Sequence, residues 1–366
     1  MKKEHRSESF GVVWLIILLM ALANTFTAFA QVKQATVLVN GISCDLEQGI
    51  LKVEFVTPDV VRVQYTGENT FIGNGTDVCL PRAVDNPVRW VYTPNPDCYL
   101  LKSDSLIVRV DLSTASITYL DKEGGLLLQE DQNIPRISEK RVTKQVIYDE
   151  HSKHIEKTAD GDKEIKNVLR YDIIGHTWKY RINFKWQPLE ALYGWGAHME
   201  DYMNLRGKEL YLCQHNLKAM VSVLNSTAGY GLLFDAGCAM MFKDNSEGSF
   251  VELEAAKQID YYFMKGKTMD AVVANYRLLT GNSPMMPLYL FGYIQSKERY
   301  VSSDDLINTL KEYRQRQIPI DMIVQDWQYW GKYGWNAMKF DEDRYPDPGS
   351  MMKELHEMDV RLMISV

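Results

Sequence analysis

A single carboxylate, Asp326, stands among aromatic side chains near the C-terminal end of the 366-residue sequence. Four rings follow it closely along the chain, namely Trp327, Tyr329, Trp330 and Trp335. A carboxylate can accept hydrogen bonds from two neighbouring hydroxyl groups of a sugar, while flat rings cover the apolar face of the same sugar. The residue types therefore point to sugar binding through Asp326, Trp327 and Trp330. The alternative is that Asp326 caps the following loop and the rings fill a core.

Strand and helix patterns alternate in the residues around Asp326. The expected order is a strand at Leu288–Gly292, a helix opened by Ser302 and Asp305, a buried strand at Ile320–Val324, a helix at Ser350–Met358 and a strand at Arg361–Val366. This alternation predicts βαβ units and a parallel sheet. Ligands bind at the C-terminal ends of the strands of such a sheet, so its position favours a binding role for Asp326 over a capping role.

The residues from about 35 to 265 have a different period. In the segment 51–55 apolar residues alternate with charged ones, and alternation returns in the segments 60–65, 107–112 and 117–120. Period two with turn residues about every ten positions predicts an antiparallel β-sandwich. Residues 137–169 carry charges of both signs, which indicates an exposed hairpin or loop rather than a binding patch.

A helix and a linker join the two patterns. Thr268 can cap a helix that ends at Gly281, and the apolar residues Val272, Val273, Tyr276 and Leu279 fall on roughly one face of it. Pro284 and Pro287 then mark a linker. The predicted domains are therefore a β-sandwich with its connecting helix at 31–285 and the start of an α/β domain at 286–366.

A second aromatic stretch, Leu192–Gly207, reads LYGWGAHMEDYMNLRG. Its glycines at 194 and 196 allow an unusual backbone turn. His198, Glu200 and Asp201 could suggest a metal or an acid/base site, but one loop histidine is more often a surface residue. We therefore expect a rim loop beside a pocket, and neither a metal nor a cofactor.

The first thirty residues resemble a secretory signal peptide. A positive start precedes the apolar run Val12–Ala23, and Ala28-Phe29-Ala30 forms a small-x-small site that would leave Gln31 as the new N-terminus. The alternative is an uncleaved anchor, because the uncharged stretch from Ser9 to Val32 is long enough to span a membrane. Cleavage is favoured, which predicts a secreted or periplasmic protein without a stable membrane span.

Cysteine spacing and net charge argue against a zinc protein and against a nucleic-acid-binding protein. The five cysteines are odd in number and contain no CxxC pair, so a zinc site is not expected. Export would permit a disulfide such as Cys79–Cys98, but buried thiols are the favoured state. The formal net charge of -7 gives no indication of a nucleic-acid partner.

The motifs together resemble glycoside hydrolase family 31, the α-glucosidase and α-xylosidase family. The resemblance rests on LYGWGAH (192–198), GYGLLFD (229–235), YRLLTGNSPMMPLYLFGYIQSKERY (276–300), RQIPIDMIVQDWQYW (316–330) and FDEDRYPDPGSMMKELHEMDVRLMISV (340–366). It implies a galactose-mutarotase-like sandwich followed by a (β/α)₈ barrel. Asp326 matches the family's sugar-binding aspartate and Trp327 a substrate-contacting neighbour, and VQDWQYW is more similar to the α-xylosidases.

The family is retaining, and its nucleophile and acid/base lie on later barrel strands. The resemblance therefore implies that both lie beyond Val366 and that no catalytic residue is present here. The stretch 286–366 is also far shorter than the about 250 residues of a complete barrel. We expect the N-terminal part of a retaining α-glycoside hydrolase, an α-xylosidase or α-glucosidase, that releases non-reducing-end α-linked sugars from oligosaccharide or polysaccharide-derived substrates. The alternative is a non-catalytic secreted glycan-binding β-sandwich protein.

Overall fold

The computed structural model describes residues 31–73, 78–80, 87–158, 161–334 and 337–365, which form two compact units divided between Asn282 and Ser283. The predicted signal peptide and Trp335 lie outside the described residues. Within the described ranges, no helix is long and apolar enough to cross a membrane. No disulfide joins the five cysteines, all of which lie in described segments.

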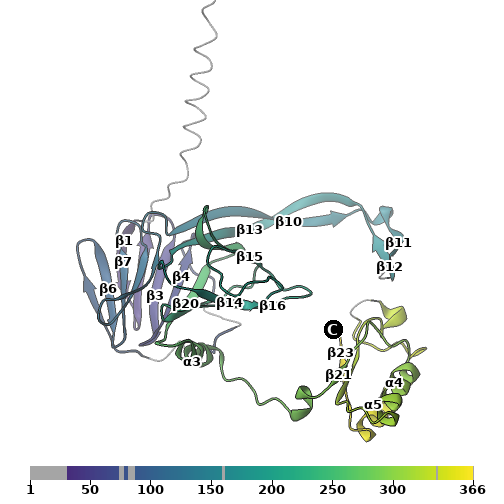
Figure 1. Cartoon of the computed structure of the whole chain (residues 1–366). Coiled ribbons are helices and arrows are strands. Elements are labelled where there is room, and N and C mark those ends of the chain that lie inside the picture. The colour runs from purple at the N-terminus through teal and green to yellow at the C-terminus, as the bar shows by residue number, and fades with distance from the viewer. Residues whose placement is uncertain (1–30, 74–77, 81–86, 159–160, 335–336, 366) are drawn as a thin grey trace, which may run out of the picture. The chain divides into compact units, whose positions relative to one another are not determined.

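The first unit is an antiparallel β-sandwich, as the period-two patterns predicted (Figure 1). Its eight-stranded sheet has the order β1 (Val32–Val37), β2 (Gly41–Leu46), β3 (Ile50–Thr57), β4 (Val60–Thr66), β20 (Ile259–Lys265), β17 (Tyr230–Phe234), β16 (Ala219–Ser226) and β14 (Leu192–Ala197). The ten-stranded sheet has the order β15 (Glu209–Leu212), β18 (Met240–Asn245), β19 (Gly248–Ala256), β13 (Val168–Lys185), β9 (Leu126–Glu130), β8 (Ile117–Asp121), β7 (Leu106–Asp111), β6 (Cys98–Ser103) and β5 (Trp90–Pro94), with β10 (Arg136–Tyr148) paired to β13.

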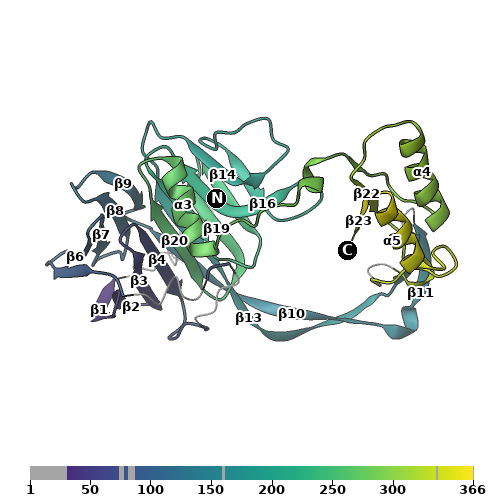
Figure 2. The same ribbon diagram turned by 90° about the horizontal axis from the view of Figure 1, so that it is seen from below.

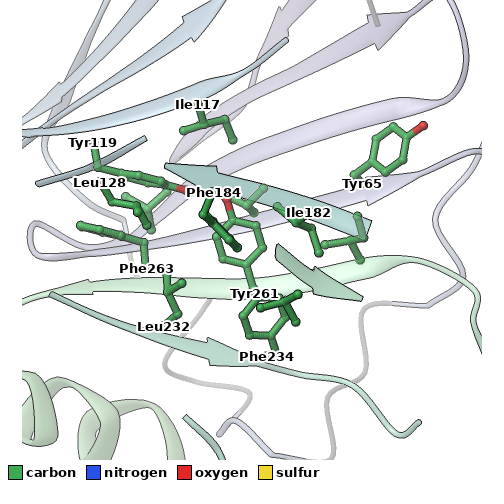
Figure 3. Close-up of a cluster of buried hydrophobic side chains, with 14 of the residues drawn as sticks. Tyr65, Ile117, Tyr119, Leu128, Ile182, Phe184, Leu232, Phe234, Tyr261 and Phe263 are labelled. Carbon is green, nitrogen blue, oxygen red and sulfur yellow. Dashed lines mark hydrogen bonds between the residues drawn. The ribbon is translucent and has the colours of Figure 1, made fainter. Parts of the chain in front are cut away.

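Aromatic side chains from both sheets meet in the sandwich core (Figure 3). Tyr119 of β8 stacks on Phe263 of β20, with ring centroids 4.0 Å apart and planes 4° apart. The hydroxyl groups of Tyr119 and Tyr261 lie 2.9 Å from each other, and Tyr261 donates to the fully buried Glu130. Arg136 donates to the same carboxylate at 2.6 Å. The core therefore contains a charge pair in which both carboxylate oxygens of Glu130 accept hydrogen bonds, although the buried Nε of Arg136 has no partner among the described residues.

Helix α3 (Met269–Thr280) covers the outer face of the eight-stranded sheet at β16, β17 and β20 (Figure 2). Thr268 caps it as predicted, with its hydroxyl accepting the Ala271 N–H at 3.2 Å. Val272 and Leu279 are buried against the sheet. Val273 was expected on the same face but is 45% exposed, because it follows Val272 by one residue and so points about 100° away around the helix.

Strands β10 and β13 continue beyond the sandwich as a two-stranded arm (Figure 1). Its end carries the short helix η1 (Glu150–Ser152) and the hairpin of β11 (His154–Thr158) and β12 (Gly161–Ile165), so the expected exposed hairpin is confirmed. Inside the sandwich β13 buries Tyr180, Ile182 and Phe184. On the arm, β13 contains one extra residue between Gly175 and Ile173, which reverses the alternation of its side chains. Tyr171 and Ile173 therefore lie on the same face as Tyr180 and Ile182, but Ile173 is 68% exposed.

The second unit begins a parallel α/β fold, which confirms the predicted βαβ pattern. Its sheet has the order β21 (Ile294–Gln295), β22 (Met322–Gln325), β23 (Arg361–Ile364), and all its pairings are parallel. The helices α4 (Ser303–Gln315) and α5 (Pro348–Glu357) pack side by side (Figure 2). Short helices η2 (Leu288–Phe291) and η3 (Gly331–Tyr333) complete the unit.

One strand of this unit was predicted wrongly. Leu288–Gly292 is a 3₁₀ turn, and the first strand starts only at Ile294. The reason is local hydrogen bonding, because the N–H groups of Leu290 and Gly292 donate to carbonyls of Pro287 and Tyr289 nearby in the chain. Groups bonded in this way cannot join a strand ladder. The helix start was predicted correctly, since the Ser302 hydroxyl accepts the Asp305 N–H at 3.2 Å.

Candidate functional site

Asp326 is the first residue after β22, the central strand of the parallel sheet. Its carboxylate is half-buried, and it makes no hydrogen bond or ion pair to any part of the chain that the structure describes. A carboxylate partly withdrawn from water is unfavourable in free energy unless donors reach it, and the described residues supply none. The strand places it at the C-terminal edge of the sheet, where α/β folds bind ligands.

Trp327 lies beside Asp326 and is only partly buried against the core of the second unit. Its N–H donates to the carbonyl of Glu298 at 3.2 Å, which ties it to the segment after β21. The Arg299 guanidinium carbon lies 5.1 Å from the centre of the indole ring, within the range of a cation–π contact. Arg299 also donates to the side-chain oxygen of Gln328 at 2.6 Å. The loops after two adjacent strands are therefore joined next to Asp326.

The next two rings lie deeper in the fold. Tyr329 is fully buried and Trp330 is 7% exposed, and both belong to the hydrophobic core of the second unit. Their ring centroids are 5.1 Å apart, and Tyr329 lies equally close to Phe340. Packing of this kind supports the alternative that these rings are core residues. The sugar contact assigned to Trp330 from the sequence stays a prediction, as do those of Asp326 and Trp327.

The end of the site loop rests on Asp341. Gly331 has a φ of +47°, and a Cβ atom there would lie 1.9 Å from the Asp341 carboxylate. Asp341 donates its N–H to the Tyr329 carbonyl at 2.9 Å and accepts from the Lys332 N–H. Desolvation raises the pKa of Asp341, but hydrogen bonds from the Asp343 and Lys332 N–H groups and the Lys332 charge hold it below its ordinary value. The ionised carboxylate of Asp341 thus helps to fix the loop that follows β22.

Sequence reasoning missed Arg299, Gln328 and Asp341. Arg299 carried only a weak signal, because it lies in the connection between the strand predicted at Leu288–Gly292 and the helix opened by Ser302, whereas Asp326 closely follows its predicted strand. Gln328 and Asp341 carried none, since their roles come from loop contacts across about ten to thirty residues.

The second candidate stretch, Leu192–Gly207, was expected to form a rim loop. Its first part, Leu192–Ala197, is instead a strand. It forms β14 at the edge of the eight-stranded sheet, because it pairs with β16 through a bulge between Gly194 and Gly196. A side chain at Gly196 would collide with the Ala219 carbonyl at 1.9 Å. Trp195, between the glycines, has a φ of +63° and fills the sandwich core. The glycines therefore serve packing here.

The polar residues after β14 contact each other and the sandwich. His198 Nε2 lies 2.6 Å from the Trp195 carbonyl, and its Nδ1 lies 3.9 Å from Glu200. Glu200 in turn pairs with Lys218 at 3.2 Å. Among the described residues, no group of three acidic, histidine or cysteine side chains could hold a metal ion.

Comparison with known proteins identifies both units. Residues 50–242 match the glycosyl hydrolase 31 N-terminal galactose mutarotase-like domain, and residues 283–366 match the glycosyl hydrolases family 31 TIM-barrel domain. An alpha-xylosidase of Saccharolobus solfataricus is 31% identical over 325 residues, which cover 86% of this chain and 40% of that protein. An uncharacterized family 31 glucosidase of Pseudescherichia vulneris is 31% identical over 195 residues, or 52% of this chain and 36% of that protein.

Solved structures share the fold. A GH31 alpha-xylosidase from a soil metagenome, complexed with xylose, has a TM-score of 0.71 at 22% identity over 91% of this chain and 47% of its own. A Flavobacterium johnsoniae GH31 dextranase, complexed with isomaltotriose, has a TM-score of 0.71 at 20% identity over 92% of this chain and 38% of its own. The chain thus spans less than half the length of these relatives. The sandwich and the barrel start, matched in that order along the sequence, mean that the chain belongs to glycosyl hydrolase family 31.

Proposed function

We propose that the complete protein carrying these residues is a retaining α-glycoside hydrolase that releases non-reducing-end α-linked xylosyl or glucosyl units from oligosaccharides. The observation that carries the proposal is the half-buried carboxylate of Asp326 at the C-terminal end of β22, to which no described residue donates a hydrogen bond. Such an acceptor suits a pair of sugar hydroxyl groups, because charge-assisted hydrogen bonds are about twice as strong as neutral ones. The partly exposed ring of Trp327 can cover the C–H face of the same sugar.

Support for the sugar class comes from the relatives. The Saccharolobus protein is named an alpha-xylosidase, and the soil metagenome enzyme holds xylose in its crystal structure. The dextranase holds isomaltotriose, which keeps a glucosyl substrate open for this chain. The α-xyloside is the first substrate to test.

In the proposed division of labour, Asp326 binds the sugar and does not attack it. A retaining mechanism needs a nucleophile and an acid/base about 5–5.5 Å apart. We assign both to later barrel strands outside the 366 residues, in keeping with the 40% of the alpha-xylosidase that the chain covers. Residues 31–366 alone are then expected to hydrolyse neither an α-xyloside nor an α-glucoside.

The proposed location is secreted or periplasmic. The support is the sequence pattern of residues 1–30, with its positive start, apolar run and Ala28-Phe29-Ala30 site. Expression of the complete gene followed by N-terminal sequencing tests this. A mature protein that begins at Gln31 outside the cytoplasm agrees with the proposal, whereas an intact N-terminus in the membrane fraction contradicts it.

The activity is tested with the complete protein and with p-nitrophenyl α-D-xyloside and α-D-glucoside. We expect turnover of at least one of them with retention of the anomeric configuration, as followed by NMR of the first-formed sugar. Asp326→Ala should lower kcat/KM by a factor that corresponds to several kcal/mol of lost transition-state stabilisation. The reason is the loss of two hydrogen bonds of ~1.5–3 kcal/mol each. The matched control is Asp343→Ala, which removes a carboxylate with an exposed side chain from the same region.

Two outcomes would overturn the proposal. One is a complete, folded protein that binds xylose or glucose without hydrolysing either glycoside, which would favour the non-catalytic glycan-binding alternative. The other is Asp326→Ala with the kcat/KM of the unchanged protein, which would show that Asp326 is only a structural residue.

A further inference from the structure

The junction beside Asp326 joins the C-terminal ends of two adjacent strands through one side chain. Arg299 lies between β21 and α4, while Trp327 and Gln328 lie in the loop after β22. The guanidinium of Arg299 donates to the Gln328 side-chain oxygen at 2.6 Å and lies over the Trp327 ring, with 5.1 Å between its carbon and the ring centre. One backbone bond, from Trp327 N–H to the Glu298 carbonyl, runs alongside. These contacts fix the direction of the ring next to Asp326.

The backbone at Gln328 is strained, which shows that the loop is held in place. Its φ of +60° is in the left-handed region, where a residue with a Cβ atom is disfavoured. Strained residues persist only where surrounding contacts compensate for them, and they concentrate at functional sites. The bond from Arg299 acts on this very residue. The Gly331 N–H bond to the Gln328 carbonyl, at 3.2 Å, is local and does not connect the loop to another strand.

We propose that Arg299 is a positioning residue of the sugar site: through Gln328 and the indole face it holds the Trp327 ring beside Asp326 and so sets the affinity for the bound sugar. The inference rests on the proposed function and adds to it. Arg299 acts on the ring that covers the sugar rather than on the reacting atoms. Its removal should therefore weaken binding more than it slows the chemical step.

An arginine suits this task for a geometric reason. Its planar guanidinium can lie flat on an indole ring and still direct an N–H group at a neighbouring oxygen, whereas the lysine ammonium is a compact point charge on a flexible stem. Arg299→Lys is therefore not a conservative change here, although it preserves the charge. Gln328→Glu, in contrast, retains an acceptor for the guanidinium and should preserve the contact.

The kinetic test compares Arg299→Ala, Arg299→Lys, Gln328→Ala and the double Ala variant in the complete protein. With whichever of the two p-nitrophenyl glycosides is hydrolysed, both Arg299 variants should raise KM about tenfold, which corresponds to one lost charge-assisted bond, with little change in kcat. The double variant should be no worse than the worse single variant, because the two residues act as one contact. Gln328→Glu should avoid most of the KM effect of Gln328→Ala, because its carboxylate still accepts from the guanidinium.

The matched control is Lys297→Ala in the same segment. Lys297 pairs with Asp305 at 3.3 Å and lies over the Tyr300 ring, so its loss removes a positive charge without touching the Trp327 loop. The control should keep its KM. An unchanged KM in Arg299→Ala, or effects of the two single changes that multiply in the double variant, would overturn the inference.

A second measurement separates this inference from the proposed function. Hydrogen exchange at the Trp327 amide of the ligand-free protein should become faster in Arg299→Ala and Gln328→Ala but not in Lys297→Ala. Unchanged exchange overturns the positioning role even in an active enzyme. Faster exchange in a protein that hydrolyses neither glycoside supports the positioning role and overturns only the proposed function.

Discussion

Two carboxylates show how the two units of this protein differ. Glu130 in the sandwich is fully buried and accepts hydrogen bonds from Arg136, Tyr261 and the Ile117 N–H. Asp326 in the second unit is half-buried and has no partner in the described part of the chain. A partnered interior charge serves the fold, because both carboxylate oxygens of Glu130 accept hydrogen bonds inside it. A carboxylate left open at a strand end contributes little to folding and remains available to a ligand.

The same contrast applies to rings and loops. In the sandwich, Tyr119, Tyr261 and Phe263 interlock across the two sheets and leave no ring accessible (Figure 3). Beside Asp326, the ring of Trp327 is partly exposed, and contacts from Arg299 direct it rather than enclose it. Substitutions in the sandwich core should therefore lower stability far more than substitutions at exposed positions or beside Asp326.

The largest loss of stability is expected for Glu130→Gln. The change leaves the Arg136 guanidinium buried without a counter-charge, and breaking a buried pair in this way costs about 3–5 kcal/mol. Urea unfolding of the complete protein, followed by circular dichroism, measures it. The matched control is Glu139→Gln on β10, the strand that also carries Arg136. Its exposed pair with Arg141 is expected to contribute under about 0.5 kcal/mol. Equal effects of the two changes would contradict the assignment of Glu130 to the fold.

Two isoleucines on one face of β13 give the next comparison. Ile182→Ala removes a fully buried side chain and should cost about 3 kcal/mol in unfolding free energy, from lost transfer energy and a cavity. Ile173→Ala, on the arm, removes a side chain that is 68% exposed and should cost under about 0.5 kcal/mol. A large loss at Ile173 in the same urea experiment would mean that the arm face is covered in the complete protein.

Gly331→Ala should have a moderate effect that remains near the site. The added methyl group would collide with the Asp341 carboxylate, and the alanine backbone would have to keep the positive φ of Gly331. Together these effects should cost about 2 kcal/mol in unfolding free energy. Hydrogen exchange should accelerate in residues 326–334 and stay unchanged in the sandwich. Acceleration that spreads through β3 and β4 would contradict the division of the chain into two separately packed units.

Much of this fold follows from local sequence pattern. The alternation around Val53 predicts a half-buried strand, and the Thr268 and Ser302 caps mark the helix starts. The strand before Asp326 gives the carboxylate its position at the edge of the sheet. The pattern is less informative at Leu288–Gly292, where an apolar run suits a strand or a 3₁₀ turn equally well and only local hydrogen bonds decide.

The candidate site was predictable only in part. Asp326 and Trp327 adjoin a strand end, so their position depends on nearest neighbours in the chain. The contacts of Arg299 and Asp341 arise where separate loops meet, and periodicity contains no information about such meetings. For the same reason the sequence could not distinguish the partly exposed Trp327 from the buried Trp330.

The most direct test of the central claim measures stability and catalysis together in Asp326→Asn. The substitution keeps the shape of the side chain and removes its charge, and no partner in the described residues is lost. We predict an unfolding free energy within about 0.5 kcal/mol of the unchanged protein, as for other changes away from structural contacts. In the same variant, kcat/KM for the hydrolysed p-nitrophenyl α-glycoside should fall at least about a hundredfold relative to the unchanged protein, because the hydrogen bonds to the transition state are weaker. A variant that loses stability, or one that retains its kcat/KM, would contradict the claim that Asp326 is kept open for the sugar.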